Sequence, residues 1–380
     1  MHPRVFAGAF GAALLATPAA AEGLPAVLAW SAYDVGSAGY SQAVGIGAAL
    51  KNRSGVTLRV LPGKNDVSRL APLRDGKVHF SATGFGSGYL SIEGVFNFGE
   101  RDWGPQPVRL VAMSNGEDCA GIIVAGDIGV RTYADLKGKR LPWVKGAPAL
   151  NYVMSSYLRF AGLDLKDVTL VEFGGYGATM DAVVAGQLDG ALTNSSSGFA
   201  TKIAAGPRGH IYPPVPHDDA EGWKRLNEVA PFLVKHICRE GAGVTEPFES
   251  ASYPYPVLIA YDSQDPQLVH AMTKAIFDLY PDFKDAAPGA RGWALDRQVL
   301  NWVMPFHEGA IRYYREAGRW TAEMQENNDR LLERERLLRT AWEGYKAGAP
   351  QDAAAFAKGW MERRHTVLQE AGFNPVWRDW

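Results

Sequence analysis

The sequence predicts an α/β protein with two lobes of similar architecture. The first observation is a repeat, because DGKVHFSATGFGS at residues 75–87 returns as AGQLDGALTNSSS at residues 185–197. In each copy a glycine is followed seven positions later by a threonine, with a short apolar strand between them and small polar residues after it. The second observation is length, since 380 residues are too many for one ordinary core and suit two lobes.

The first 60 residues after the amino-terminal segment follow the order β-α-β-α-β. The strand LPAVLAWSAYD leads into a helix, GYSQAVGIGAALKNRSG, whose apolar side chains recur at helical spacing and which closes on Gly55. VTLRVLPG alternates as a second strand, DVSRLAPLRDG is a short helix despite Pro72, and KVHFSAT is the third strand. Parallel strands need crossover helices of this kind, so the unit predicts a parallel sheet.

The same order recurs further along the chain. The strands KGKRLPWV, DVTLVEF and LDGALT alternate with the helices PALNYVMSSYLRFAG and GATMDAVVAGQ. Pro148 suits the first turn of the earlier helix, and Gly162 stands past its end. Each copy of the repeat is therefore the last strand of a βαβαβ unit, and its carboxyl end faces the crevice where such sheets bind ligands.

Two crossings of the chain join these units. Strands over 108–127 lead out of the first unit, and the strand YPVLIAYD at 255–262 leads back after the second. We therefore expect lobe I to comprise residues 22–126 and 256–319, lobe II to comprise residues 127–255, and the lobes to close on a ligand about a hinge. The alternative is a rigid pair of Rossmann-like domains, for example in an enzyme, because a fold alone does not fix function.

The amino-terminal residues predict export. MHPRVFAGAFGAALLATPAAAEG has a basic start, an apolar run and an A-x-A cleavage signal, so residues 1–21 are predicted to be a signal peptide and the mature protein to be periplasmic. The apolar run is too short to remain as a membrane span. The alternative interpretation is an apolar first element of the fold.

Composition excludes several classes of protein. Lys+Arg 39 against Asp+Glu 41 gives no basic excess, which argues against nucleic acid as a partner. The eight histidines are scattered without metal-ligand spacing, and no P-loop, G-x-S-x-G or complete dinucleotide fingerprint is present, so we expect no metal, no cofactor and no catalytic site. Cys119 and Cys238 would form a disulfide only if their Cα atoms lie within about 7 Å, which the sequence leaves open.

Three segments resemble the TAXI group of solute-binding proteins, which serve tripartite ATP-independent periplasmic (TRAP) transporters. AWSAYDVGSAGYSQAVGIGAAL resembles the family's glycine-rich first loop and helix, and GVRTYADLKGKRL is similar to a segment common to many periplasmic binding proteins. PFHEGAIRYYREAG is similar to the family's own most discriminating segment, and the resemblance runs from about Leu28 to Gly318. It implies a type II periplasmic-binding-protein fold without catalysis, which captures a small organic solute, expected to be a carboxylate, and presents it to the membrane subunits of a TRAP permease.

Two alternatives to this function remain. A sensory receptor feeding a membrane kinase would use the same pocket, and a secreted enzyme could be built on a doubly wound fold. The run NSSS at residues 194–197 could house a nucleophile, but no histidine is placed by sequence to activate it.

Loops that follow parallel strands predict the ligand contacts, because helix amino ends there favour an anion. The predicted ligand-binding residues are Ser31, Tyr33, Asp34, Gly36, Ser37, Asp66, Arg69 and Thr83 in the first lobe, and Lys145, Asn151, Tyr176, Thr193, Asn194 and Ser195 in the second. Arg69 is expected either to clamp a carboxylate or to form a solvated ion pair with Asp66 three residues before it. The less favoured alternative for Ser37 and Asp34 is helix capping.

The chain departs from the family pattern in its pocket loops. Gly84 stands where a glutamine is usual, and Pro148, Ala149 and Leu150 stand where small hydroxyl-bearing residues are usual. These changes predict a roomier and more apolar pocket, with the Tyr176 ring stacked on the solute and weak binding of glutamate-like amino acids.

Residues 320–380 predict a helical extension beyond the resemblance. Met324, Leu331, Leu338 and Tyr345 recur every seven residues, and a second amphipathic helix covers about 352–371. Packing of both helices back on the lobes is one interpretation, and a dimer seam is the other. We favour the first, and with it a monomer.

Overall fold

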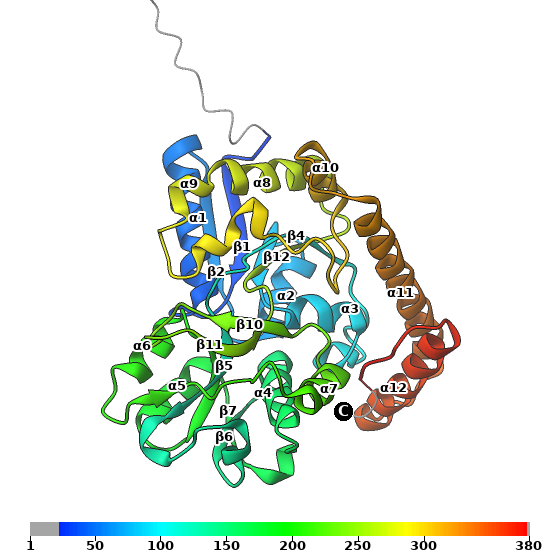
Figure 1. Ribbon diagram of the computed structural model, residues 1–380. Coiled ribbons are helices and arrows are strands. Elements are labelled where there is room, and N and C mark those ends of the chain that lie inside the picture. The colour runs from blue at the N-terminus through cyan, green and yellow to red at the C-terminus, as the bar shows by residue number, and fades with distance from the viewer. Residues whose placement is uncertain (1–22, 378–380) are drawn as a thin grey trace, which may run out of the picture.

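The computed structural model describes residues 23–377, so the predicted signal peptide lies outside the described residues. Figure 1 shows an upper lobe that carries both the amino-terminal strands and α8 to α10, a lower lobe built from the middle of the chain, and two long helices along one flank. The element order of both predicted βαβαβ units is present, but only in lobe I do the three strands of the unit belong to one sheet.

The sheet of lobe I fixes the fold class. It contains β1 (Val27–Ala32), β2 (Thr57–Pro62), β3 (Phe80–Thr83), β4 (Val108–Met113) and β12 (Val257–Tyr261), in the order β2-β1-β3-β12-β4. β1 is parallel to β2 and β3, whereas β12 lies antiparallel between β3 and β4. A strand that returns from the other lobe and inserts next to the strand that left is the arrangement of a type II periplasmic-binding-protein fold, as predicted.

Local sequence explains the lobe I helices. They are α1 (Ala38–Ser54), α2 (Asp66–Arg74), α3 (Ser91–Glu93), α8 (Pro266–Asp278), α9 (Tyr280–Phe283) and α10 (Glu308–Glu316). Ser37 caps α1 by accepting from the Tyr40 amide, and Gly55 ends that helix with a positive φ. Asn65 and Ser68 form a capping box at the start of α2.

Lobe II contains three small sheets. β5 (Ala120–Ala125) pairs antiparallel with β8 (Gly190–Asn194) and β9 (His210–Ile211), β6 (Arg140–Val144) is parallel to β7 (Thr169–Phe173), and β10 (Val234–Cys238) is antiparallel to β11 (Phe248–Ser252). Its helices are α4 (Pro148–Phe160), α5 (Tyr176–Val184), α6 (Gly198–Ala204) and α7 (Ala220–Val229). Because β5 belongs to this lobe, the first crossing lies between residues 113 and 120, earlier than the boundary predicted at residue 126.

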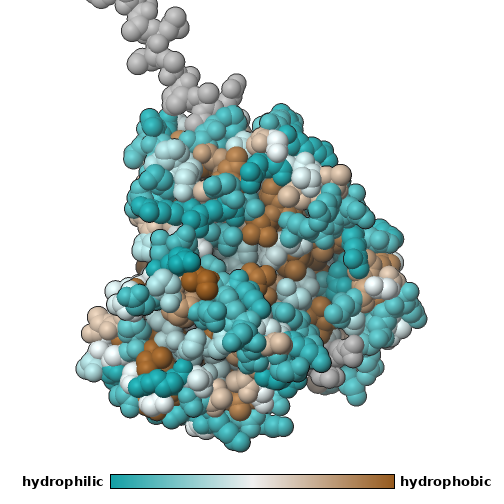
Figure 2. Space-filling view, in the orientation of Figure 1, coloured by the Kyte–Doolittle hydropathy of each residue, from teal (hydrophilic) through white to brown (hydrophobic). Residues whose placement is uncertain are grey.

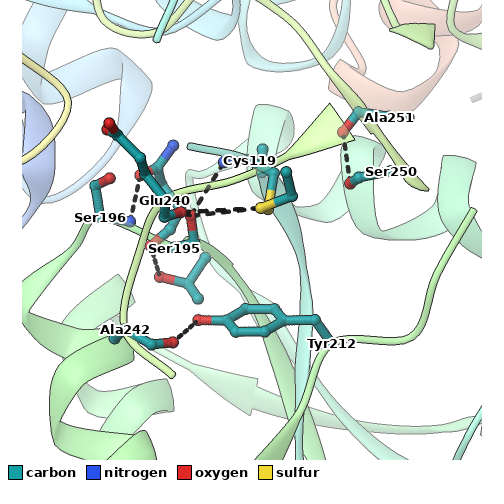
Figure 3. Close-up of a disulfide and its surroundings, with 12 residues drawn as sticks. Cys119, Ser195, Ser196, Tyr212, Glu240, Ala242, Ser250 and Ala251 are labelled. Atoms are coloured by element: carbon teal, nitrogen blue, oxygen red, sulfur yellow. Dashed lines mark hydrogen bonds between the residues drawn. A yellow bond between two sulfur atoms is a disulfide. The ribbon is translucent and has the colours of Figure 1, made fainter. Parts of the chain in front are cut away.

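A disulfide links Cys119 to Cys238, whose Cα atoms are 5.4 Å apart (Figure 3). Of the two states that the sequence left open, the bonded one is therefore present. Cys119 directly precedes β5 at the first crossing, and Cys238 ends β10. The bond ties the crossing to the β10–β11 ribbon, which limits how far these two segments can separate.

The C-terminal helices α11 (Ala322–Lys346) and α12 (Ala353–Glu370) pack back on lobe I, as the favoured interpretation predicted (Figure 1). Glu93 of α3 accepts from Arg334 of α11 at 2.6 Å and also pairs with Arg364 of α12. The indole N–H of Trp360 donates to the Gly94 carbonyl at 2.6 Å. These contacts are buried, and the buried apolar side chains of the two helices form a cluster of their own beside the main core.

Aromatic side chains join the two lobes. Phe85 of lobe I stacks on Phe232 of lobe II, with ring centroids 4.1 Å apart. Beyond the C-terminal helices, Trp377 lies 5.2 Å from Tyr89 of lobe I and 5.8 Å from Tyr152 on α4. These residues belong to one apolar cluster that runs through both lobes, and several apolar patches lie near the level of the lobe junction in Figure 2. The lobes are therefore in contact in this structure.

Candidate ligand-binding site

A small cavity of about 30 Å³ lies between the lobes. Its wall is formed by Tyr33, Ser37, Ala38, Ala120, Leu150, Tyr176, Leu192, Thr193, Asn194, Ser197, Tyr253 and Tyr255. These residues come from the loop after β1, the start of α1, the ends of β5 and β8, the starts of α4 to α6, and the second crossing. The cavity therefore lies where the carboxyl ends of β1 and β8, the amino end of β5 and the hinge meet, close to the usual ligand position in such folds.

Four tyrosines dominate the cavity wall. The rings of Tyr33 and Tyr255 meet edge to face with centroids 5.2 Å apart. Burial raises the pKa of Tyr33 to about 12 and raises the pKa values of Tyr176, Tyr253 and Tyr255 as well. All four phenols are therefore neutral at physiological pH and act only as hydrogen-bonding hydroxyls and apolar rings.

The tyrosine hydroxyls on the cavity wall differ in whether they have a hydrogen-bond partner. Tyr176 donates to Thr193 at 2.8 Å. In the part of the chain that the structure describes, the hydroxyls of Tyr253 and Tyr255 have no hydrogen-bond partner. These two groups are the free polar positions that a bound solute can use.

The repeated sequence endings make the same contact in both lobes. Thr83 donates to Ser87 four residues later at 3.0 Å, and Thr193 pairs with Ser197 four residues later at 2.9 Å. In each lobe a residue from the preceding helix also bonds to the threonine, Arg69 in the first and Tyr176 in the second. The repeat therefore fixes the turn after the last strand of each unit, and only the second copy reaches the cavity.

Arg69 and Asp66 do not line the cavity. The Arg69 guanidinium donates to Asp66 Oδ1 at 2.5 Å, to Thr83 Oγ1 at 3.1 Å and to the Gly63 carbonyl at 3.2 Å, and it lies 3.7 Å from the centroid of the Tyr33 ring. Both side chains of the pair are buried, at 3% and 0% exposed. The pair predicted as one alternative is present, but it is buried rather than solvated.

Asp66 also bridges the lobes. Its Oδ2 accepts from the amide of Ala149, in the first turn of α4, at 3.1 Å. Gly86 permits this approach, because a Cβ there would stand 2.6 Å from Asp66 Oδ1 and would also overlap the Ala149 side chain. A carboxylate from lobe I thus caps a helix of lobe II.

Several other predicted residues hold the framework. Asn151 bonds through its side chain to both the amide and the carbonyl of Val144, each at 2.9 Å. Lys145 is exposed and pairs with Glu172. Ser31 donates to the Arg69 carbonyl at 2.8 Å, and the Asp34 side chain accepts from the amide of Val35.

Gly36 and Ser195 hold the backbone around the cavity. The Gly36 carbonyl accepts from the amide of Gly198 across the lobes at 3.1 Å. The Ser195 hydroxyl accepts from the Cys119 amide and donates to the Glu240 carbonyl at 2.7 Å (Figure 3). The structure places Tyr33, Ser37, Tyr176, Thr193 and Asn194 of the predicted set on the cavity wall.

The predicted extra room at Gly84 is not present. A Cβ at this position would overlap the hydroxyl of Tyr33, which fills the space that a larger side chain would take. The small side of Gly84 is therefore filled by Tyr33 from another loop. The cavity is apolar, but it is narrow.

A family model matches residues 34–318, which is most of the chain and includes the loops that surround the cavity. The chain belongs to the NMT1-like family. The match ends before α11, so the C-terminal helices of this NMT1-like protein lie outside it. No curated protein sequence matches the chain.

Solved structures of binding proteins resemble this NMT1-like chain at low identity. A periplasmic binding protein of an ABC transporter from Brucella ovis, with glutathione bound, is 14% identical over 65% of each chain, with a TM-score of 0.42. A protein from Bordetella bronchiseptica RB50 is 15% identical over 93% of each chain, with a TM-score of 0.46. The alkanesulfonate-binding protein SsuA from Xanthomonas axonopodis pv. citri, bound to MOPS, is 15% identical over 88% of this chain and 98% of its own, with a TM-score of 0.40. The fold assignment rests on the strand order described above.

Two further features of this NMT1-like protein bear on its chemistry. Among residues 23–377, no three His, Cys, Asp or Glu side chains gather closely enough to hold a metal ion. None of the helices in the same range combines the length and the apolar character needed to span a membrane.

Proposed function

We propose that this protein is an exported TAXI-type receptor, which binds a small organic solute between its two lobes and delivers it to the membrane subunits of a TRAP permease. The observation that carries the proposal is the cavity itself, because its wall is assembled from both lobes and from the second crossing. Separation of the lobes would break the Gly198 to Gly36 hydrogen bond beside it and open a path for a solute. We expect a monomer in the periplasm.

The proposal includes an absence of catalysis. In the NSSS run, where the sequence suggested a nucleophile, the Ser195 hydroxyl is engaged with the backbone of Cys119 and Glu240, and the Ser197 hydroxyl with Thr193 and the Ala200 amide. A carboxylate solute was expected from the sequence and stays a prediction. The cavity wall carries no charged side chain among the described residues, which favours an uncharged solute instead.

Native mass spectrometry of protein purified from the periplasm without refolding tests receptor function. We expect one small molecule to co-purify, to be released unchanged on denaturation, and to rebind. Its uptake by cells should require both this receptor and a multi-span permease. Release of a chemically altered compound, or uptake that persists without a permease, would contradict the proposal.

The two free hydroxyls provide a matched test of the site. The double variant Tyr253→Phe/Tyr255→Phe keeps both rings and removes the two polar groups, so we expect binding of the co-purified solute to weaken by about 1–3 kcal/mol in calorimetry. Tyr40→Phe, on α1 and away from the cavity wall, is the control and should leave affinity unchanged. Equal affinities of all three proteins would place the solute elsewhere.

A further inference from the structure

The chain itself supplies a carboxylate between the two lobes, the side chain of Asp66. One oxygen accepts from the Arg69 guanidinium of lobe I at 2.5 Å, and the other accepts from the Ala149 amide of lobe II at 3.1 Å. The side chain is fully buried. Each guanidinium nitrogen of Arg69 makes one hydrogen bond, to Asp66, to Thr83 or to the Gly63 carbonyl, and the buried side chain does not line the cavity.

A guanidinium facing a helix amino end is the arrangement that receives a carboxylate in proteins. Pro148 has no amide hydrogen, so Ala149 carries the first N–H of α4, and Asp66 already accepts it. Gly86 packs against both Asp66 and Ala149, closely enough that even a Cβ would overlap them. The position is therefore filled by the chain's own carboxylate, and a second carboxylate cannot enter it.

The cavity beside this pair has no charged side chain on its wall within the described residues. An anion that entered it would lose its water and meet no charged side chain, only the partial positive charges at the amino ends of α1 and α5. A cation would face the positive amino ends of α1 and α5, where Ser37 and Tyr176 line the cavity. The free hydroxyls of Tyr253 and Tyr255 can instead bond to carbonyl, ether or hydroxyl oxygens of a neutral molecule.

We propose that the cavity, once enlarged by separation of the lobes, takes an uncharged solute, and that Asp66 determines this specificity because it occupies the carboxylate position formed by Arg69 and the amino end of α4. The solute's carbon frame packs on the tyrosine rings, and its oxygen atoms bond to the tyrosine hydroxyls. The proposal rests on the receptor function given above and names the class of solute for the same site.

Chemical rescue of Asp66→Gly tests the role of Asp66. The substitution removes a group the size of acetate and leaves Arg69 without its counter-charge, so we expect a lower midpoint of thermal unfolding. Sodium acetate should raise that midpoint by several degrees, whereas equal concentrations of sodium chloride or of acetamide, the neutral analogue of acetate, should not. The wild-type midpoint should respond alike to acetate and chloride.

Two variants control for the site of acetate binding. Asp66→Asn keeps the volume and one acceptor oxygen, so no space opens and acetate should have no specific effect. Asp66→Gly/Arg69→Ala removes the guanidinium as well and should also lose the response. Equal acetate responses in Asp66→Gly and Asp66→Asn would overturn the proposal.

A binding panel on the unmodified protein tests the solute class even if Asp66→Gly does not fold. We expect no calorimetric binding of acetate, benzoate, glutarate or glutamate, and binding of any of them with a dissociation constant below about 1 mM overturns the proposal. A carboxylic acid that co-purifies with the protein would also overturn it while leaving receptor function intact. Turnover of a neutral co-purified compound would instead overturn receptor function and leave the specificity of the cavity standing.

Discussion

The Arg69 guanidinium neutralises a carboxylate that is completely buried, so its removal should affect folding before it affects binding. We expect Arg69→Ala to lower the free energy of unfolding by about 3–5 kcal/mol, because Asp66 is left as an uncompensated buried charge. Urea denaturation followed by circular dichroism measures this. The exposed Arg59 on β2 provides the control, and Arg59→Ala should change stability by less than about 0.5 kcal/mol.

The double variant Asp66→Ala/Arg69→Ala separates the pair from the surrounding packing. Because it removes both charges, it should be less destabilised than the sum of the two single variants. Additive losses would show that the ion pair contributes little and that packing of the Arg69 stem on Tyr33 is the main interaction.

The sequence predicted Arg69 and Asp66 as ligand-binding residues, but it did not indicate that their side chains are buried away from the cavity wall. The i,i+3 spacing predicted their pairing, whereas burial of the pair depends on Gly86 and Ala149, which come from other parts of the chain. Tyr253 and Tyr255 were missed as ligand contacts, although Tyr255 begins the predicted strand 255–262 that returns to lobe I and Tyr253 lies two residues before it. Both residues flank prolines in the second crossing, and the hinge position itself was the signal that could have indicated them.

Among the elements, the short helix α3 has an unusual role because its Glu93 joins α11 and α12. The carboxylate is fully buried and receives the guanidinium groups of Arg334 and Arg364. Burial alone would raise the Glu93 pKa, but the two positive charges outweigh it and hold the pKa below the ordinary value. The C-terminal helices thus depend on an ionised glutamate for their attachment.

This attachment gives a pH dependence of stability. Because the folded pKa of Glu93 lies below the unfolded one, its stabilising contribution is complete at neutral pH and is lost as pH falls through the acidic range below about 4. We expect Glu93→Gln to lower stability by roughly 3–5 kcal/mol at pH 7, and the difference from wild type to narrow under acid. Thermal unfolding of both proteins at several pH values measures this.

The exposed Glu343 on α11 provides the matched control for that series. Glu343→Gln should follow the wild-type stability profile at every pH. A gap between Glu93→Gln and wild type that stays constant from neutral to acid pH would contradict the assignment of the effect to ionisation of Glu93.

Most elements of the two βαβαβ units could be predicted, because their strands are apolar and their helices have periodic apolar faces. The ribbon of β10 and β11 could not. β11 reads FESAS, with one large apolar residue and no clear alternation, and its pairing is defined by β10 and by the disulfide at Cys238. The sequence also did not indicate that β5 belongs to lobe II. An apolar strand next to a crossing has the same sequence pattern whichever of the two lobes it joins.

On the scale of the whole molecule, the lobes are held together even without a solute in the cavity. Asp66 reaches Ala149, Gly36 reaches Gly198, and Phe85 stacks on Phe232, each pair joining one lobe to the other. Because the cavity holds only about 30 Å³, a larger solute can enter it only after these contacts break.

The consequence concerns the speed of binding. We expect the observed association rate, followed by stopped-flow fluorescence, to rise with solute concentration and then level off at the rate at which the lobes open. Phe232→Ala removes the aromatic stack outside the cavity and should raise that plateau, whereas a rate that increases without limit in both proteins would exclude such gating. At high solute abundance, delivery to the permease would then be paced by the receptor's own opening, so that uptake stays steady when the supply of solute fluctuates.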